Sequence, residues 1–204
     1  MTPARARARP NPDQVAKEVV KRFVSAAKVG ALVSQFAKQY KPITGSLSPE
    51  QLRGTFRTQR RLSTDQLVAL MRWKMRKRQE KCLKANSASG IEEITERVAR
   101  AISAGELPSK LAQIAAHLHG IHIPGASTIL ATWDDLFPII DVRAWRALLL
   151  ITEEPFFERG KRTLFRYDEF DLYVDTLRSA ARQLRVTPRD LDKALYMEGK
   201  ASAR

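Results

Sequence analysis

Apolar residues recur at helical spacing along almost the whole chain, and this pattern limits the fold more than any other feature of the sequence. The clearest repeats are those of Val15, Val19 and Phe23 near the start and of Ile91, Ile94, Val98 and Ile102 near the middle. Spacing of three or four residues places such side chains on one face of an α-helix. No alternation of apolar and polar residues, the pattern of a half-buried strand, extends beyond a few positions. The sequence therefore predicts an all-α protein with about ten helices.

The N-terminal part predicts a basic arm followed by helices. Residues 1–12 (MTPARARARPNP) are rich in Arg and Pro, and we expect this arm to be flexible. The segment Asn11-Pro12-Asp13 is typical of a helix start, because Asn caps backbone N–H groups and Pro is favoured in the first turn. We expect this helix to reach about Val29 and to break at Gly30. A second apolar run then continues through Phe36.

A linker and two further helix starts follow. Residues 41–49 (KPITGSLSP) are rich in Pro, Gly and Ser, which predicts the linker. Ser48-Pro49-Glu50-Gln51 and Ser63-Thr64-Asp65-Gln66 each place a capping Ser ahead of an acidic residue and an amide. We expect the second of these to open a long helix that ends near Lys84. The expected organisation is an arm over residues 1–12, N-terminal helices over 13–45 and one domain, of two closely packed helical lobes, over 46–204.

The charge balance is the strongest global indication of function. The chain has 204 residues, of which 36 are Lys or Arg and 22 are Asp or Glu, so its formal net charge is +14. Lys and Arg gain affinity for DNA by releasing the counterions that are condensed on its phosphates. RNA-binding, ribosomal and membrane-surface proteins share this balance. The charge therefore favours nucleic acid as the class of partner, but it does not distinguish DNA from RNA.

The remaining composition excludes several classes of protein. With 44% hydrophobic residues the chain is globular, and no run approaches the roughly 18 consecutive apolar residues of a membrane span. No apolar segment of signal-peptide type follows the basic arm, so we expect a cytoplasmic protein. Cys82 is the single cysteine, which excludes an intramolecular disulfide. His117, His119 and His122 are spaced too unevenly to face one ion from a regular helix, so neither a metal nor a cofactor is expected.

The segment Leu118–Arg146 (LHGIHIPGASTILATWDDLFPIIDVRAWR) combines a turn, a helix and an acidic residue in an informative order. A turn at Gly120 precedes an apolar helix from about Pro124 to Trp133. A proline-containing loop then leads to Asp141, which opens another helix. This order resembles the helix-hairpin-helix and the following catalytic Asp of the base-excision DNA glycosylase superfamily.

The resemblance extends over most of residues 50–200. The segment Tyr173–Lys200 is similar to the C-terminal part of a little-characterised bacterial branch of that superfamily. The resemblance implies a hairpin whose backbone N–H groups bind DNA phosphates without reading the sequence. The residues that match this part of the hairpin are Gly120, His122 and Gly125.

The hairpin departs from the family pattern at chemically sensitive positions. The pattern is hydrophobic-Pro-Gly-hydrophobic-Gly, and here His119 and His122 replace the proline and the second glycine. In bifunctional members a lysine four residues after the first glycine forms a Schiff base with the sugar, and the matching residue here is Pro124. Proline offers no nucleophile. The resemblance therefore implies a monofunctional enzyme that uses water.

Asp141 is the catalytic residue that the resemblance implies. Breaking an N-glycosidic bond builds positive charge on the sugar, and a fixed carboxylate stabilises that charge or activates the attacking water. An Asp before a helix is also an ordinary N-cap, and the two roles are compatible because a capping carboxylate is held rigidly. Arg143 and Arg146 follow Asp141 and are candidates for contact with phosphate or for orienting Asp141. We expect Trp133 and Trp145 to lie in the core.

The densest basic run lies outside the hairpin, at residues 72–78 (RWKMRKR). Five of its seven residues are cations, and no acid intervenes. Helical spacing gathers them into a stripe, and like charges at this density favour a polyanion as partner. The expected phosphate contacts of this stripe are Arg72, Lys74, Arg76 and Lys77.

The resemblance, together with the positive charge, implies a protein that binds double-stranded DNA and hydrolyses the N-glycosidic bond of a flipped damaged or mismatched base. The alternative is a non-catalytic DNA-binding protein on a degenerate glycosylase scaffold, which the changed hairpin and the missing lysine favour. A third interpretation is a basic helical RNA-associated protein. We expect Asp141 to face an open basic cleft if it is catalytic and to lie buried against its own helix if it is only a cap.

Overall fold

The computed structural model describes residues 8–40, 43–75, 83, 85–158 and 164–201, and all structural statements concern these residues. In them the chain forms ten α-helices, one short 3-10 helix and no strand, which confirms the predicted all-α class. The elements are α1 (Pro12–Phe23), α2 (Ala26–Gln39), α3 (Pro49–Gln59), α4 (Thr64–Met75), α6 (Ala88–Ser103), α7 (Pro108–Ala115), α8 (Ile123–Trp133), α9 (Val142–Thr152), η2 (Pro155–Phe157), α10 (Tyr167–Leu184) and α11 (Pro188–Ala201).

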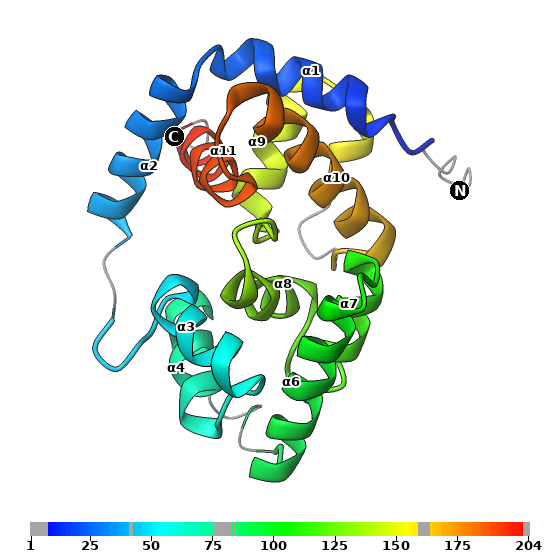
Figure 1. The fold of residues 1–204 in the computed structure, drawn as a ribbon. Coiled ribbons are helices and arrows are strands. Elements are labelled where there is room, and N and C mark those ends of the chain that lie inside the picture. Colours follow the sequence, from blue (N-terminus) through cyan, green and yellow to red (C-terminus); the bar gives the residue numbers. More distant parts are fainter. Residues whose placement is uncertain (1–7, 41–42, 76–82, 84, 159–163, 202–204) are drawn as a thin grey trace, which may run out of the picture.

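The helices form two lobes (Figure 1). We call the group α1, α2, α9, α10 and α11 the terminal lobe, because it contains the first and last helices, and the group α3, α4, α6, α7 and α8 the central lobe. The chain thus leaves the terminal lobe after α2 and returns to it with α9. Helix α7 packs against α10, and one hydrophobic core continues through both lobes.

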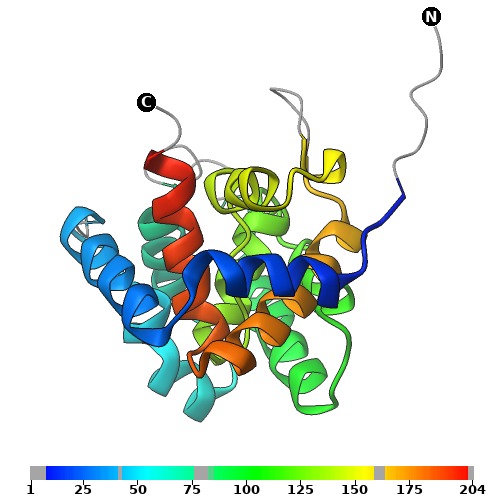
Figure 2. The same cartoon turned by 90° about the horizontal axis from the view of Figure 1, so that it is seen from above.

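The N-terminal helices are part of the terminal lobe. Helix α1 lies across α10 and also contacts α9, as Figure 2 shows from above. Helix α2 packs along α11. Val15, Val19 and Phe23 of α1 are buried, as their spacing predicts. Helices α1 and α2 therefore pack in the same lobe as α9, α10 and α11.

The predicted helix starts are confirmed at the level of individual hydrogen bonds. The side chain of Asn11 accepts a bond of 2.8 Å from the backbone N–H of Asp13. Ser48 and Gln51 form a reciprocal capping box at α3, and Ser63 and Gln66 do the same at α4. Each pair satisfies backbone donors that the first turn of a helix leaves without a partner.

The break between the first two helices lies six residues earlier than the sequence suggested. Val24 adopts a left-handed backbone with φ of 64°, and the Ser25 side chain caps α2 by accepting from the N–H of Lys28. Gly30, the expected break, lies inside α2. A glycine in an exposed helix costs only about 1 kcal/mol, which a well-capped helix tolerates. The cap at Ser25 therefore decides the boundary.

Other boundaries differ by a few residues. Helix α6 begins at Ala88, three residues ahead of Ile91, the first residue of the apolar repeat, because Ser87 caps the helix by accepting from the N–H of Gly90. Helix α7 ends at Ala115, so residues 116–119 separate it from Gly120. Helix α4 is described as far as Met75, and its expected end near Lys84 lies outside the described residues.

Of the two tryptophans expected in the core, Trp145 is buried, and Trp133 is half-buried and packs against the core. Trp145 is buried among Phe157, Phe165 and Tyr173. Trp133 packs edge-on against the buried Phe56. Across the described residues, no helix combines the length and the apolar character that a bilayer crossing needs.

Candidate functional site

Asp141 both caps a helix and reaches across to the other lobe. One carboxylate oxygen, Oδ1, accepts a hydrogen bond of 2.9 Å from the N–H of Arg143 and so caps α9. The other, Oδ2, lies 3.1 Å from Nζ of Lys74, which belongs to α4 in the central lobe. The side chains of Asp141 and Lys74 are 23% and 10% exposed, so the pair is mostly shielded from water.

This ion pair lines a pocket with a volume of about 510 Å³ between the two lobes. A pocket of this size is typical of sites for small organic groups. Helices α2, α4, α9 and α11 contribute to it, together with the loop before α9. The residues that line it are Phe36, Tyr40, Trp73, Lys74, Met75, Ile139, Asp141, Arg143, Arg189, Asp192, Lys193 and Tyr196.

Aromatic rings make up much of the pocket wall. Phe36 and Tyr40 are stacked with ring centroids 4.9 Å apart, and the Tyr40 ring lies 5.1 Å from that of Trp73. Tyr40 also donates a hydrogen bond of 3.0 Å from its hydroxyl to the carbonyl of Trp73. Tyr196 meets the edge of Phe36, and the guanidinium of Arg143 lies over the Tyr196 ring at 5.1 Å and hydrogen-bonds its hydroxyl. Such walls suit a planar ring as ligand.

Lys74 keeps the carboxyl of Asp141 ionised. Burial raises the pKa of Asp141, but the positive charge of Lys74 and the hydrogen bonds from Lys74 and from the Arg143 backbone outweigh burial and lower that pKa below its ordinary value. The charge of Arg143 acts in the same direction. A carboxylate, which stabilises positive charge, is therefore present in the pocket at neutral pH.

A buried polar network adjoins the pair of Lys74 and Asp141, and two of its members, Arg189 and Asp192, line the same pocket. The carboxylate of Asp192 accepts hydrogen bonds from the Tyr173 hydroxyl at 2.6 Å and the Ile139 N–H at 3.1 Å, and it pairs with Arg189. Asp192 and Arg189 are each 3% exposed. Burial raises the pKa of Asp192 in spite of Arg189 and Tyr173. Burial and the charge of Asp192 together raise the pKa of Tyr173 well above its usual range.

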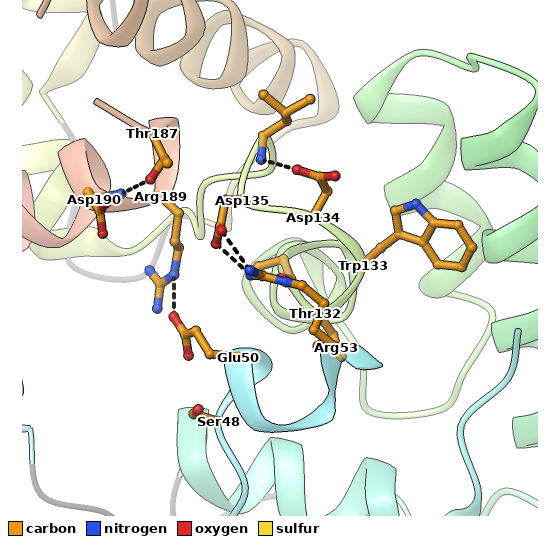
Figure 3. A network of polar contacts seen from close by, with 12 residues as sticks. Ser48, Glu50, Arg53, Thr132, Trp133, Asp134, Asp135, Thr187, Arg189 and Asp190 are labelled. Atoms are coloured by element: carbon orange, nitrogen blue, oxygen red, sulfur yellow. Dashed lines mark hydrogen bonds and ion pairs between the residues drawn. The ribbon is translucent and has the colours of Figure 1, made fainter. Parts of the chain in front are cut away.

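Helix α3 connects the central lobe to this network (Figure 3). Glu50 lies 3.5 Å from Nε of Arg189 and 3.2 Å from Nζ of Lys193. One turn later Arg53 forms two hydrogen bonds of 2.5 and 2.6 Å with Asp135, in the loop between α8 and α9. Glu50 and Arg53 of α3 thus contact α11 and the loop before α9, and both of these segments contribute to the pocket.

The Glu50 contacts predict a pH dependence of stability. Burial raises the pKa of Glu50, but Arg189 and Lys193 outweigh burial and lower it from 4.5 to about 2. A lowered pKa in the folded state stabilises the protein above the unfolded value, and this contribution is lost as the pH falls from 4.5 toward 2. Because the side chain is 36% exposed, we expect Glu50→Gln to lose about 1 kcal/mol at neutral pH.

Urea unfolding of wild type and Glu50→Gln between pH 7 and pH 2 measures this contribution. The difference in unfolding free energy between the two proteins should shrink to nothing across the acidic range. A difference that stays constant with pH would show that the Glu50 carboxylate gains nothing from its two cationic neighbours.

The hairpin has the backbone of a glycine turn. Gly120 has φ of 83°, a left-handed conformation that glycine adopts at no steric cost. Asn86 holds the turn by accepting from the N–H of His119 and donating to its carbonyl. His122 is the N-cap residue of α8 and makes no side-chain cap bond, and both histidines are exposed.

Met75 of α4 lies between the hairpin helix and the pocket. Gly125 lies in the first turn of α8, and a Cβ at this position would be 3.2 Å from Cε of Met75. Met75 also lines the pocket that contains Asp141. Pro124 is in the same turn, where its carbonyl accepts from Ser127 and Thr128. The first turn of α8, which follows the Gly120 turn, therefore approaches the wall of the Asp141 pocket at Met75.

The basic run of α4 does not form the expected exposed stripe in its described part. Lys74 points into the pocket and pairs with Asp141. Arg72 reaches the other way, toward the carbonyl of Gly45 at 3.4 Å. Helical geometry explains the difference, because residues two positions apart lie on different faces. Arg76 and Lys77 lie outside the described residues, and Arg146 is exposed on α9.

Most of the pocket was not found from the sequence. Lys74 and Asp141 are 67 positions apart, and the aromatic residues come from the end of α2, from α4 and from α11. No local motif marks such a set. The one usable indication was the aromatic content of α2, where Phe36 and Tyr40 are four residues apart and so share a helix face.

The described residues contain no cluster of three or more His, Cys, Asp or Glu side chains with the arrangement of a metal site. Nδ1 of His117 lies 3.0 Å from the carbonyl oxygen of Gln113. Comparison of the chain with models of protein families, with curated proteins and with solved structures gives no match.

Proposed function

We propose that this protein binds double-stranded DNA and acts as a monofunctional DNA N-glycosylase on a damaged or mismatched base that is flipped into the pocket between the lobes. One observation carries the proposal. The carboxylate of Asp141, held at the N-terminus of α9, lines an aromatic-walled pocket whose edge at Met75 touches the glycine hairpin helix. A duplex on the hairpin would have this pocket directly beside it.

The chemistry requires a carboxylate in this position. The bond between C1′ of the deoxyribose and the base nitrogen breaks with both electrons leaving on the base, and the sugar becomes a cation. The ionised Asp141 stabilises that cation, and a water molecule adds its oxygen to C1′. The protons of this water supply the new sugar hydroxyl and the released base. The products are a free base and an abasic site.

The backbone around the hairpin suits contact with phosphate. The N-terminus of α8 follows the Gly120 turn directly, and its cap residue His122 leaves the first N–H groups without a side-chain acceptor. Such N–H groups, with the helix dipole behind them, bind phosphate oxygens. Arg143 and Arg146, both exposed on α9, are the proposed further contacts.

A non-catalytic DNA-binding protein is the second candidate, and one observation favours it. Asp141 already has a helix to cap and a lysine to neutralise it, so both of its oxygens have structural partners. In that case the carboxylate contributes to stability and the pocket holds an extrahelical base without cleaving it.

The deciding experiment compares wild type with Asp141→Asn on duplexes that carry different lesions. Asn caps helices as well as Asp does, so the variant keeps the fold and loses the charge. We expect the release of abasic product to fall by about 10²- to 10³-fold with duplex affinity retained. Asp65→Asn, an exposed carboxylate in the first turn of α4, is the matched control and should behave as wild type.

Alkaline cleavage of a labelled strand measures the abasic product, and fluorescence anisotropy measures binding. Binding by all three proteins without product on any duplex would establish the non-catalytic candidate. Absence of duplex binding in the wild type would contradict both the glycosylase and the non-catalytic DNA-binding protein.

A further inference from the structure

We propose that Lys74 is a catalytic residue of the pocket, whose ammonium group neutralises the negative charge on the departing base. This inference rests on the proposed glycosylase function and assigns a partner to Asp141 in it. It also names the class of substrate: bases that are neutral in the DNA and leave as anions.

The position of Lys74 is the first support. Its Nζ lies 3.1 Å from Asp141 while its side chain is only 10% exposed, and both residues line the same pocket. Lys74 comes from the central lobe and Asp141 from the terminal lobe, so the pair spans the space between the lobes. Lys74 also acts electrostatically on the buried Asp192. Burying an ammonium is costly, and a surface ion pair would serve stability equally well.

The charges of the pair are complementary to the charges that the reaction creates. Heterolysis of the C1′–N bond gives a positive sugar and a negative base within a few ångströms of each other. The pocket holds a negative and a positive group at a comparable separation, 3.1 Å. With the sugar at Asp141 and the base at Lys74, each new charge meets its opposite in a shielded site, where such stabilisation is large. An isolated carboxylate would stabilise only the sugar.

The surroundings of Lys74 fit a base. Trp73 precedes it in α4, and the Tyr40 ring lies 5.1 Å from that of Trp73. Guanidinium groups already lie over two of the pocket rings, Arg189 over Trp73 at 5.6 Å and Arg143 over Tyr196 at 5.1 Å. With these cations and Lys74 in place, a positively charged ring is disfavoured and a neutral planar ring is accepted.

The substrate class follows from the same charges. A ring-alkylated base such as 7-methylguanine is cationic in DNA and leaves as a neutral molecule, so the ammonium of Lys74 gives its departure no assistance. Uracil and hypoxanthine are neutral in DNA and leave as anions. We therefore expect Lys74 to matter for the second group and not for the first.

The first experiment measures base release from duplexes that contain uracil, hypoxanthine or 7-methylguanine, with wild type, Lys74→Met and Lys74→Arg. Lys74→Met should release uracil and hypoxanthine about 10²- to 10³-fold more slowly, whereas the slower release of 7-methylguanine that we expect from the wild type should change little. Lys74→Arg, which keeps the charge, should restore part of the rate. Lys110→Met, which removes an exposed lysine paired with Glu106, is the matched control.

An equal loss for all three bases would overturn the proposal, because a lysine that only positions Asp141 affects every substrate alike. Wild-type release of 7-methylguanine alone would overturn it as well and leave the proposed function intact. A covalent adduct between wild type and an abasic duplex after borohydride reduction, absent in Lys74→Met, would replace the proposed role with that of an amine nucleophile.

A binding measurement tests the charge pairing without turnover. A duplex with a cationic pyrrolidine at the abasic position imitates the sugar cation, and 5-nitrouracil, anionic at neutral pH, imitates the departing base. We expect the wild-type complex to bind 5-nitrouracil at least about tenfold more tightly than uracil, and Lys74→Met to lose this preference. Equal affinities in the wild-type complex would overturn the role of Lys74 alone. Failure to bind the duplex would overturn the proposed function too.

Discussion

Replacing Gly199 with Ala is expected to destabilise the protein by about 3 kcal/mol, near the upper end of the usual cost of overpacking. A Cβ at this position would lie 1.9 Å from the carbonyl oxygen of Arg143 and 2.7 Å from its carbonyl carbon. Both contacts are with backbone, so no side chain can rotate away. Helices α9 and α11 would have to move apart, and the end of α9 that carries Asp141 would move with them.

Thermal unfolding measures this effect as a decrease in Tm of about 6 to 12 °C for a chain of this size. The matched control is Gly30→Ala, also inside a helix but with nothing within 4 Å of the added Cβ. There the better helix propensity of Ala should raise stability by about 0.5 to 1 kcal/mol. If both variants gained stability, the close approach of α11 to Arg143 would be refuted.

Removing the carboxylate of Asp192 is expected to cost about 3 to 5 kcal/mol. The Asp192→Ala variant leaves the Tyr173 hydroxyl and the Ile139 N–H without their acceptor in a buried site. It also leaves the guanidinium of Arg189, 3% exposed, with Glu50 as its remaining anionic neighbour at 3.5 Å. A buried charge that loses its partner costs more than the intact pair contributes.

A double variant separates the cost of the unpaired Arg189 charge from the cost of the lost hydrogen bonds. Arg189→Met with Asp192→Ala removes both charges, so it should unfold at a higher urea concentration than Asp192→Ala alone. The raised pKa of Asp192 agrees with this expectation, because burial already disfavours its ionised form. A double variant less stable than the single one would mean that Arg189 stabilises the fold through contacts other than Asp192, such as its position over Trp73.

Gly199 and Asp192 both lie on α11, and both substitutions are expected to affect the Asp141 pocket. Asp192 holds the floor of the pocket, and Gly199 permits the close contact that positions the start of α9. Tyr196, between them in sequence, contributes to the pocket wall. The last helix therefore supports the pocket along its length, although the resemblance emphasised the hairpin.

The helices and their starts were predictable from the sequence because they depend on neighbours in the chain. The caps at Asn11, Ser48 and Ser63 each involve a side chain and a backbone N–H two or three residues away. Asp141 was correctly placed at the start of a helix for the same reason. The misplaced break at Gly30 shows the limit of such rules, because Ser25 is a cap of the same local kind but the left-handed backbone of Val24 before it is not evident from the residue type.

The sequence by itself determined an all-helical chain, its strong positive charge, the glycine turn at Gly120 and the capping role open to Asp141. Only the tertiary structure decided that Lys74 is largely buried and forms an ion pair with Asp141. It also decided that aromatic rings from the end of α2 and from α11 line the pocket around this pair. The physical reason is the range of the forces involved. Caps and turns form between adjacent residues, whereas the pocket depends on how four helices pack, which the periodicity of any one of them does not specify.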